Sequence, residues 1–284
     1  MPISSERCNF VFQKTARDLR RLASEQLPQT VHSFRTSTRR LQILLKELIP
    51  ERDRKQKKLL KSLDRIRKRA GKVRELDMQL AALHSLKVPQ EPRRKTHLVH
   101  RLIELRPKHE KKLRNQLDKQ MIRDIRKQLK RAGKDVRLEK GRDPMAVARQ
   151  ELARITRPAG PISVEVLDQY RVAVKRARYT AEFAPKSPES TELIEQLKRV
   201  QDCIGHWHDW LTLTNTASER LGDVGRSSLV AALHNITGGK FRHAVAAVTA
   251  SPALIGPKPT TAMPEAPHKA GSKTAIASLA ASAA

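Results

Sequence analysis

The hydrophobic and polar positions of this chain follow a helical pattern almost throughout. Good helix formers (Leu, Arg, Lys, Glu, Gln and Ala) dominate, and runs of β-branched residues with period-two alternation are nearly absent. Prolines and glycines mark the expected helix ends, because proline cannot continue a helix and glycine weakens one. The pattern therefore predicts an all-α protein, with helices over about residues 4–26, 30–48, 51–71, 72–86, 163–184, 189–204, 206–222 and 226–249.

A long basic stretch, residues 93–142, lies between the two groups of predicted helices. We expect interruptions within it at Pro107 and Gly133. The pair Asp143-Pro144 then supplies an N-cap and a first-turn proline, which predicts another helix start.

The end of the chain differs in composition from the rest. Gly238-Gly239 is an expected interruption of the last helix, and after it prolines alternate with Ala, Thr, Ser and Lys. Such a segment has little to bury, so we expect it to be disordered. The predicted organisation is a first helical half over residues 1–157, a second over 158–250 and a tail over 251–284.

The charge balance points to a polyanionic partner. The chain has 58 Lys and Arg against 29 Asp and Glu, a formal net charge of +29. Because such an excess opposes compaction, we infer that it serves to bind nucleic acid, a membrane surface or another polyanion.

Composition excludes several classes of protein. No segment approaches the roughly 18 consecutive apolar residues of a membrane span, and the N-terminus lacks the apolar run of a signal peptide. Cys8 and Cys203 are too few for a disulfide framework. We therefore expect a cytoplasmic chain without membrane insertion. Aromatic residues make up only 3%, which argues against the stacking platforms of single-strand readers, and no glycine-rich phosphate loop is present.

A basic pattern occurs once in each half. On a helix, positions i, i+3 and i+7 share a face, so His32, Arg35 and Arg39 form one stripe that Lys46 continues. Arg40 follows directly after the first stripe. The second copy has Asp168 in the place of His32, and its basic residues are Arg171, Lys175, Arg176 and Arg178. A solvated helix face is the alternative interpretation of each stripe, and the matching pair favours a duplicated helical unit.

Each stripe is followed by a glycine and a short charged signal. Aligning Gly71 with Gly205 places Arg74 on His208 and Glu75 on Asp209. We interpret the carboxylates of Glu75, Asp77 and Asp209 as partners that orient arginine side chains, in preference to catalytic acids or bases.

These motifs resemble those of the CHAD domain family, the conserved-histidine α-helical domain. His32, Arg35, Arg39, Arg40 and Leu41 fit its H-x-x-R-x-x-x-R-R-hydrophobic signature, and residues 74–78 resemble its R-D-x-D-hydrophobic element with Glu75 for the usual Asp. The second stripe fits R-x-x-x-K-R-x-R-Y-x-x-E through Tyr179 and Glu182, and residues 200–209 resemble a final L-Q-x-x-L-G-x-x-[NH]-D element. The resemblance covers about residues 5 to 250, and it departs at Asp168, where the family usually has His.

The resemblance implies two pseudo-symmetric antiparallel helical bundles with a basic groove or pore that binds inorganic polyphosphate, in some members at polyphosphate granules. The chain also looks like a stand-alone member of that family, because the acidic E-x-E-x-K motif with which a companion CYTH domain begins is absent. The binding residues expected from the repeat and the resemblance are His32, Arg35, Arg39, Arg40, Lys46, Arg74, Arg171, Lys175, Arg176, Arg178 and His208, supported by Glu75, Asp77, Tyr179 and Asp209. We expect no catalysis, cofactor or metal, and tighter binding below about pH 6.5 if His32 takes up a proton.

Three alternatives stay open at this point. The first is a basic helical protein that binds nucleic acid, and weak non-specific binding of this kind is also expected beside polyphosphate. The second is a metal-dependent phosphohydrolase built on His206, His208 and Asp209, with His84 or Glu75 completing the set, although i and i+2 do not face each other on a helix. The third is a granule-surface scaffold that contacts other proteins through its C-terminal tail.

Overall fold

The computed structural model is helical, as the pattern predicts. It describes residues 3–49, 53–87, 92–136, 138, 141–155, 160–222 and 224–255, and all regular elements within these ranges are helices. The α-helices of these ranges are α1 (Ser5–Ser24), α2 (Pro28–Ile43), α3 (Arg54–Ser85), α4 (Pro92–Arg114), α5 (Lys119–Asp135), α6 (Pro144–Ala153), α7 (Val164–Ala181), α8 (Pro188–Leu221), α9 (Ser228–Thr249) and α10 (Pro252–Ile255). A π-helical turn, Leu44–Leu48, extends α2.

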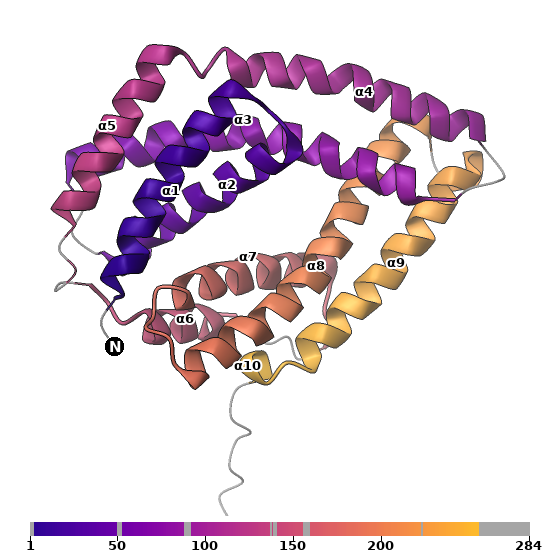
Figure 1. The fold of residues 1–284 in the computed structure, drawn as a ribbon. Coiled ribbons are helices and arrows are strands. Elements are labelled where there is room, and N and C mark those ends of the chain that lie inside the picture. The colour runs from indigo at the N-terminus through magenta and orange to yellow at the C-terminus, as the bar shows by residue number, and fades with distance from the viewer. Residues whose placement is uncertain are drawn as a thin grey trace, which may run out of the picture.

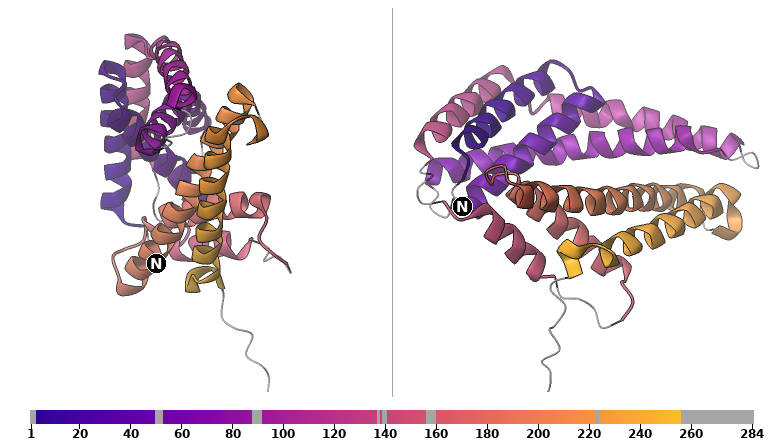
Figure 2. Two further views of the ribbon diagram at one scale, coloured as in Figure 1. Left: turned by 90° about the vertical axis from the view of Figure 1, so that its right-hand side faces the viewer. Right: turned by 60° about the horizontal axis from the view of Figure 1, so that its bottom comes forward.

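Helices α1 to α5 form one part of the molecule and α6 to α10 the other (Figure 1). The long helices α3 and α8 each pair with the helix that follows, giving the two extended hairpins α3–α4 and α8–α9 (Figure 2). Helix α2 contacts α7, and α3 contacts α8. The four helices that carry the predicted basic stripes and charged signals therefore meet between the two parts.

Local sequence explains where most helices begin. The side chains of Ser4, Asp53, Asp118, Asp143 and Ser163 each accept a hydrogen bond from a main-chain N–H of the first turn. Such caps satisfy donors that have no partner within the helix. The predicted start at Asp143-Pro144 is confirmed by α6.

Two predicted boundaries are wrong, because both fall at a glycine inside a long helix. The structure joins residues 51–71 and 72–86 into α3 across Gly71, and joins 189–204 and 206–222 into α8 across Gly205. A glycine costs only about 1 kcal/mol in a helix interior. The buried stripe of α3 continues on both sides of Gly71 through Ala70 and Val73, so tertiary packing outweighs that cost.

The expected interruptions at Pro107, Gly133 and Gly238-Gly239 are also absent, since α4, α5 and α9 run through them. Pro107 deprives the carbonyl of Ile103 of its helical donor. Both residues are exposed, so water can hydrate that carbonyl. The predicted tail coincides with described residues only over 251–255, where α10 forms, and the remainder lies outside the described residues.

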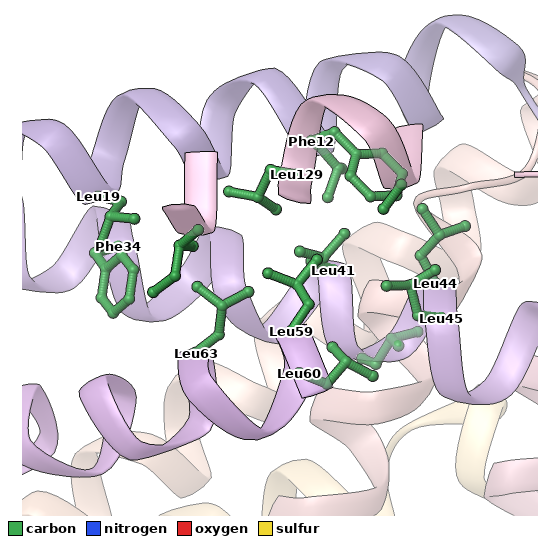
Figure 3. Close-up of a cluster of buried hydrophobic side chains, with 14 of the residues drawn as sticks. Phe12, Leu19, Phe34, Leu41, Leu44, Leu45, Leu59, Leu60, Leu63 and Leu129 are labelled. Carbon is green, nitrogen blue, oxygen red and sulfur yellow. The ribbon is translucent and has the colours of Figure 1, made fainter. Parts of the chain in front are cut away.

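Three buried clusters hold the helices together. The first fills the space among α1, α2, α3 and α5 with leucines and the rings of Phe12 and Phe34 (Figure 3). It also takes in Tyr179 and Phe183 from the second part of the chain. The second lies among α6, α7, α8 and α9 around Trp207. The third joins the far ends of both hairpins, for example Leu83 with Leu213. The helices that carry the stripes therefore pack into hydrophobic clusters that include residues from both parts of the molecule.

None of the helices in the described part of the chain combines the length and apolar character that a membrane span requires.

Candidate functional site

A cavity of about 390 Å³ lies where α2, α3, α7 and α8 come together. Its wall is formed by Arg35 of α2, by Gly71, Arg74, Glu75, Met78 and Gln79 of α3, by Arg171 and Lys175 of α7, and by Gly205, His208, Asp209 and Thr212 of α8. Five residues predicted to bind the anion (Arg35, Arg74, Arg171, Lys175 and His208) and two predicted to support them (Glu75 and Asp209) thus share one cavity. Segments more than a hundred residues apart in the chain supply them.

The side chain of Arg35 is held against α3. Its Nη1 donates to the main-chain carbonyl of Arg67 at 2.9 Å. A Cβ at Gly71 would lie 2.5 Å from the same Nη1, so only glycine leaves room for the guanidinium in this position. Burial, together with the positive charges of Arg39, Arg67 and Arg74, lowers the pKa of Arg35 to about 10. Arg35 is therefore placed among cations, with its positive charge disfavoured by the surroundings.

Two further residues of the first stripe lie beside the cavity. Arg39 follows Arg35 by one turn, and burial and the charges of Arg67 and Arg171 lower its pKa. His32 precedes Arg35 by one turn and has an exposed side chain. Desolvation and the charges of Arg74, Arg35, Lys175 and Arg40 lower the pKa of His32, so its imidazole is neutral at pH 7 in the free protein.

The residue that departs from the family pattern has a structural role. The Asp168 carboxylate accepts a hydrogen bond from Nε of Arg171 at 2.7 Å. This bond and the arginine's charge lower the pKa of Asp168, although burial opposes the shift. Because Nε is engaged, Asp168 fixes the orientation of the guanidinium that reaches the cavity.

Lys175 lies one turn further along α7. Burial and the charges of Arg39 and Arg171 lower its pKa to about 8, and Asp209 only partly offsets them. Burial raises the pKa of Asp209 itself, against the pull of Arg74 and Lys175.

His208 completes the wall on α8. Burial and the charge of Arg171 lower its pKa. Glu75, on the opposite wall, is partly engaged by Lys72 at 3.1 Å. Within the described cavity wall, four cations (Arg35, Arg74, Arg171 and Lys175) therefore face two carboxylates, those of Glu75 and Asp209.

Three of the predicted arginines lie away from the cavity, in ion pairs. Arg40 binds Glu182 at 2.6 Å, and Arg178 binds the same carboxylate at 3.3 Å. Both guanidinium groups also contact the ring of Tyr179. Burial would lower the pKa of Arg40, but the hydrogen bond and charge of Glu182 outweigh it and raise that pKa.

Arg176 connects elements in a similar way. It binds Glu47 at 2.8 Å and Glu151 at 3.3 Å, joining α7 to the π-helical turn and to α6. Two other predicted residues also lie apart: Lys46 is exposed on that turn, and Asp77 binds Nε of Arg106 at 2.8 Å, which ties α3 to α4.

Some residues of the cavity were not predicted from sequence. Gly71 and Gly205 were interpreted as helix boundaries, although both line the wall. Met78, Gln79 and Thr212 complete it. The positions 71, 74, 75 and 78 follow helical spacing, so a continuous α3 would have placed them on one face.

The H-x-H-D segment does not form a metal cluster in the structure. His208 and Asp209 line the cavity, whereas His206 is exposed. Across the described residues, no group of three or more His, Cys, Asp or Glu side chains is arranged to hold a metal ion.

Comparisons with known proteins agree on the fold. The family model of the CHAD domain matches residues 11–218. The crystal structure of the CHAD domain from the plant Ricinus communis superposes with a TM-score of 0.58 at 14% sequence identity, covering 86% of this chain and 85% of that one. No curated protein matches the chain in sequence.

Proposed function

Because this chain belongs to the CHAD domain family, a family associated with polyphosphate binding, we propose that its four-helix cavity binds inorganic polyphosphate. One observation carries the proposal. The cavity gathers cations from three helices and lowers the pKa of Arg35, Arg39 and Lys175 together. Such an arrangement is unfavourable in the free protein, and an entering polyanion relieves it.

The chemistry of the wall favours phosphate over nucleobases. Arginine can bind phosphate oxygens with two parallel N–H bonds, while lysine acts as a point charge. Among the described residues that line the cavity there is no Phe, Tyr or Trp on which a base could stack. A chain of phosphates without bases therefore suits this wall better than a single-stranded nucleic acid.

We assign the binding role to the residues in and beside the cavity. These are Arg35, Arg74, Arg171, Lys175 and His208 in the wall, with Arg39 and His32 next to them. Arg40, Arg176 and Arg178 are assigned a positioning role, because Glu47, Glu151 and Glu182 already bind their guanidinium groups. Lys46 is exposed, so it would contact only a part of the polyphosphate chain that lies on the protein surface.

The proposed activity is binding without turnover. Binding needs no nucleophile with an adjacent base. The carboxylates of the cavity reduce the positive charge of its wall. In a cell that stores polyphosphate, such a protein would associate with the granules.

Competition between polyanions tests the proposal. Labelled duplex DNA is bound to the protein and displaced with long-chain polyphosphate, and the experiment is then reversed, at equal phosphate concentration. We expect polyphosphate to displace DNA and DNA to leave polyphosphate bound. The reverse order of displacement would show that the basic surface serves nucleic acid and would reject the proposal.

A further inference from the structure

Lys175 differs in its surroundings from the exposed lysines of α3. It is half-buried on the wall of the cavity, whereas Lys57, Lys58 and Lys61 lie exposed on α3. Its amine is desolvated and close to several guanidinium groups, which lowers its pKa to about 8. An ordinary lysine has a pKa of about 10.4, so Lys175 holds a far larger fraction of unprotonated, nucleophilic amine near neutral pH.

Two oriented guanidinium groups line the same cavity as that amine. Arg171 precedes Lys175 by one turn of α7, with its guanidinium held by Asp168. Arg35 approaches from α2, held by the carbonyl of Arg67. A phosphate bound between these two guanidinium groups would place any substituent on its oxygen close to the amine of Lys175.

We propose that Lys175 is a site of acylation by acyl phosphates, small anions in which an acyl carbon is joined through oxygen to phosphate. The inference rests on the anion-binding cavity of the proposed function and adds a reaction to it. The lone pair of Nζ attacks the acyl carbon, the bond between that carbon and the phosphate oxygen breaks, and inorganic phosphate leaves. The nitrogen then releases one proton to solvent, and the product is a neutral amide.

The charged groups that face Lys175 come from each neighbouring helix. Helix α2 contributes two guanidinium groups and an imidazole, and α8 contributes an imidazole and a carboxylate. On α7 itself a cation and a carboxylate lie close, and α3 adds one of each to the wall. These groups are His32, Arg35, Arg39, Arg74, Glu75, Asp168, Arg171, His208 and Asp209. Cations outnumber anions around the amine, which both attracts the anionic reagent and raises the fraction of amine that is unprotonated.

Acylation would regulate the cavity. It removes one positive charge from the wall and adds an acyl group to a space of about 390 Å³. Because affinity for a polyanion depends on the number of cations that contact it, the modified protein should bind polyphosphate more weakly. The level of acyl phosphate would then set the fraction of protein able to bind.

Site-resolved mass spectrometry tests the inference. The full chain is incubated with acetyl phosphate at about pH 8, and acetylation is followed at each lysine. At that pH the unprotonated fraction of Lys175 exceeds that of an exposed lysine by about a hundredfold. An amine of lower pKa is also a weaker nucleophile, so the difference in reaction rate is smaller than this ratio. We expect Lys175 to react at least about fivefold faster than Lys57, Lys58 and Lys61.

Two controls separate docking from simple amine reactivity. An acetyl N-hydroxysuccinimide ester has no phosphate, so the preference for Lys175 should be smaller with it. Pyrophosphate should slow acetylation at Lys175 alone when acetyl phosphate is the reagent. A rate at Lys175 no higher than at the exposed lysines, or no protection by pyrophosphate, would overturn the inference.

The consequence for binding has its own control. Acetylated wild type should bind polyphosphate several-fold more weakly than untreated protein, while Lys175→Arg should lose little affinity on the same treatment. The two proposals fail separately. Acetylation at Lys175 without polyphosphate binding would reject only the proposed function, and polyphosphate binding without preferential acetylation would reject only this inference.

Discussion

Lys175 couples polyphosphate binding to pH, because its pKa lies close to neutral pH. In the free protein its pKa is lowered to about 8 by burial and by neighbouring arginines. A bound polyanion stabilises the ammonium form, so the pKa in the complex must be higher. Between the two pKa values, binding requires uptake of a proton. Affinity is therefore highest below the free pKa and falls as pH rises above it.

We predict that polyphosphate affinity of the wild type decreases between about pH 7.5 and about pH 9.5, by up to about tenfold for each pH unit. Calorimetry in buffers of different ionisation enthalpy should record proton uptake near pH 8. Lys175→Met should bind more weakly throughout and lose this dependence. A wild-type affinity that is constant over the range would show that Lys175 does not contact the ligand.

Arg39 and Arg40 are adjacent in sequence but have different surroundings. Arg39 lies among cations beside the cavity, and burial and Arg67 lower its pKa. Arg40 binds Glu182, and this contact raises the pKa of Arg40. Among the described residues no carboxylate forms an ion pair with Arg39, whereas Arg40 holds α2 to the end of α7.

This contrast predicts opposite effects of the same substitution. Arg39→Gln should weaken polyphosphate binding several-fold and leave thermal stability unchanged or raised. Arg40→Gln should leave affinity within about twofold but lower stability by about 1–2 kcal/mol, because Glu182 loses a charged hydrogen bond. Thermal melts and polyphosphate titrations of both variants provide the measurement. If Arg40→Gln lost the affinity and Arg39→Gln lost the stability, the assignment of the two residues would be wrong.

At the scale of elements, α3 and α8 each contain one glycine at the cavity, and the two glycines have different neighbours. At Gly71 an added Cβ would meet Nη1 of Arg35 at 2.5 Å. At Gly205 an added Cβ would meet nothing within 4 Å. Alanine improves helix propensity equally at both positions, by about 1 kcal/mol. Any difference between the two variants therefore reports on Arg35.

We predict that Gly71→Ala displaces the flexible end of Arg35 from the carbonyl of Arg67 and lowers polyphosphate affinity at least about threefold. Gly205→Ala should keep affinity within about twofold, and neither variant should lose thermal stability. Titrations of the two variants under one condition make the comparison. Equal affinities would mean that the position of Arg35 against α3 does not matter for binding.

The element pattern was largely predictable, and its errors have one cause. Helix starts were predicted where a local signal exists, as at Asp143-Pro144. Local propensity predicts breaks at Gly71, Gly205 and Pro107, because it disfavours these residues inside a helix. Packing of the flanking residues, which no local signal reports, decides these positions.

The site was predictable only as far as single helices allow. Helical spacing placed Arg35 and Arg171 on basic faces, and both line the cavity. Glu182, the partner of Arg40, and Glu47, one partner of Arg176, lie 142 and 129 residues away in the chain, so sequence alone could not separate these two arginines from the first pair. Which cations are compensated by a carboxylate is a property of the tertiary structure.

At the scale of the whole molecule, the net charge of +29 is divided between structure and binding. Part of the basic stretch over 93–142 holds the chain together, since Arg106 of α4 binds Asp77 of α3 and donates to the main-chain carbonyl of Gln26. The cavity concentrates cations with too few carboxylates to balance them. The central claim is that this imbalance, and not the net charge alone, binds polyphosphate.

The salt dependence of polyphosphate binding tests that claim most directly. Wild type, Arg35→Gln/Arg171→Gln and the equally charged control Arg20→Gln/Arg21→Gln, on the exposed face of α1, are titrated from about 50 to about 300 mM salt. We predict that the cavity variant loses at least about tenfold in affinity and that its plot of log K against log salt becomes shallower by about one to two units, while the control follows wild type. Equal losses in the two double variants would contradict the account, because they would show that net charge alone determines binding.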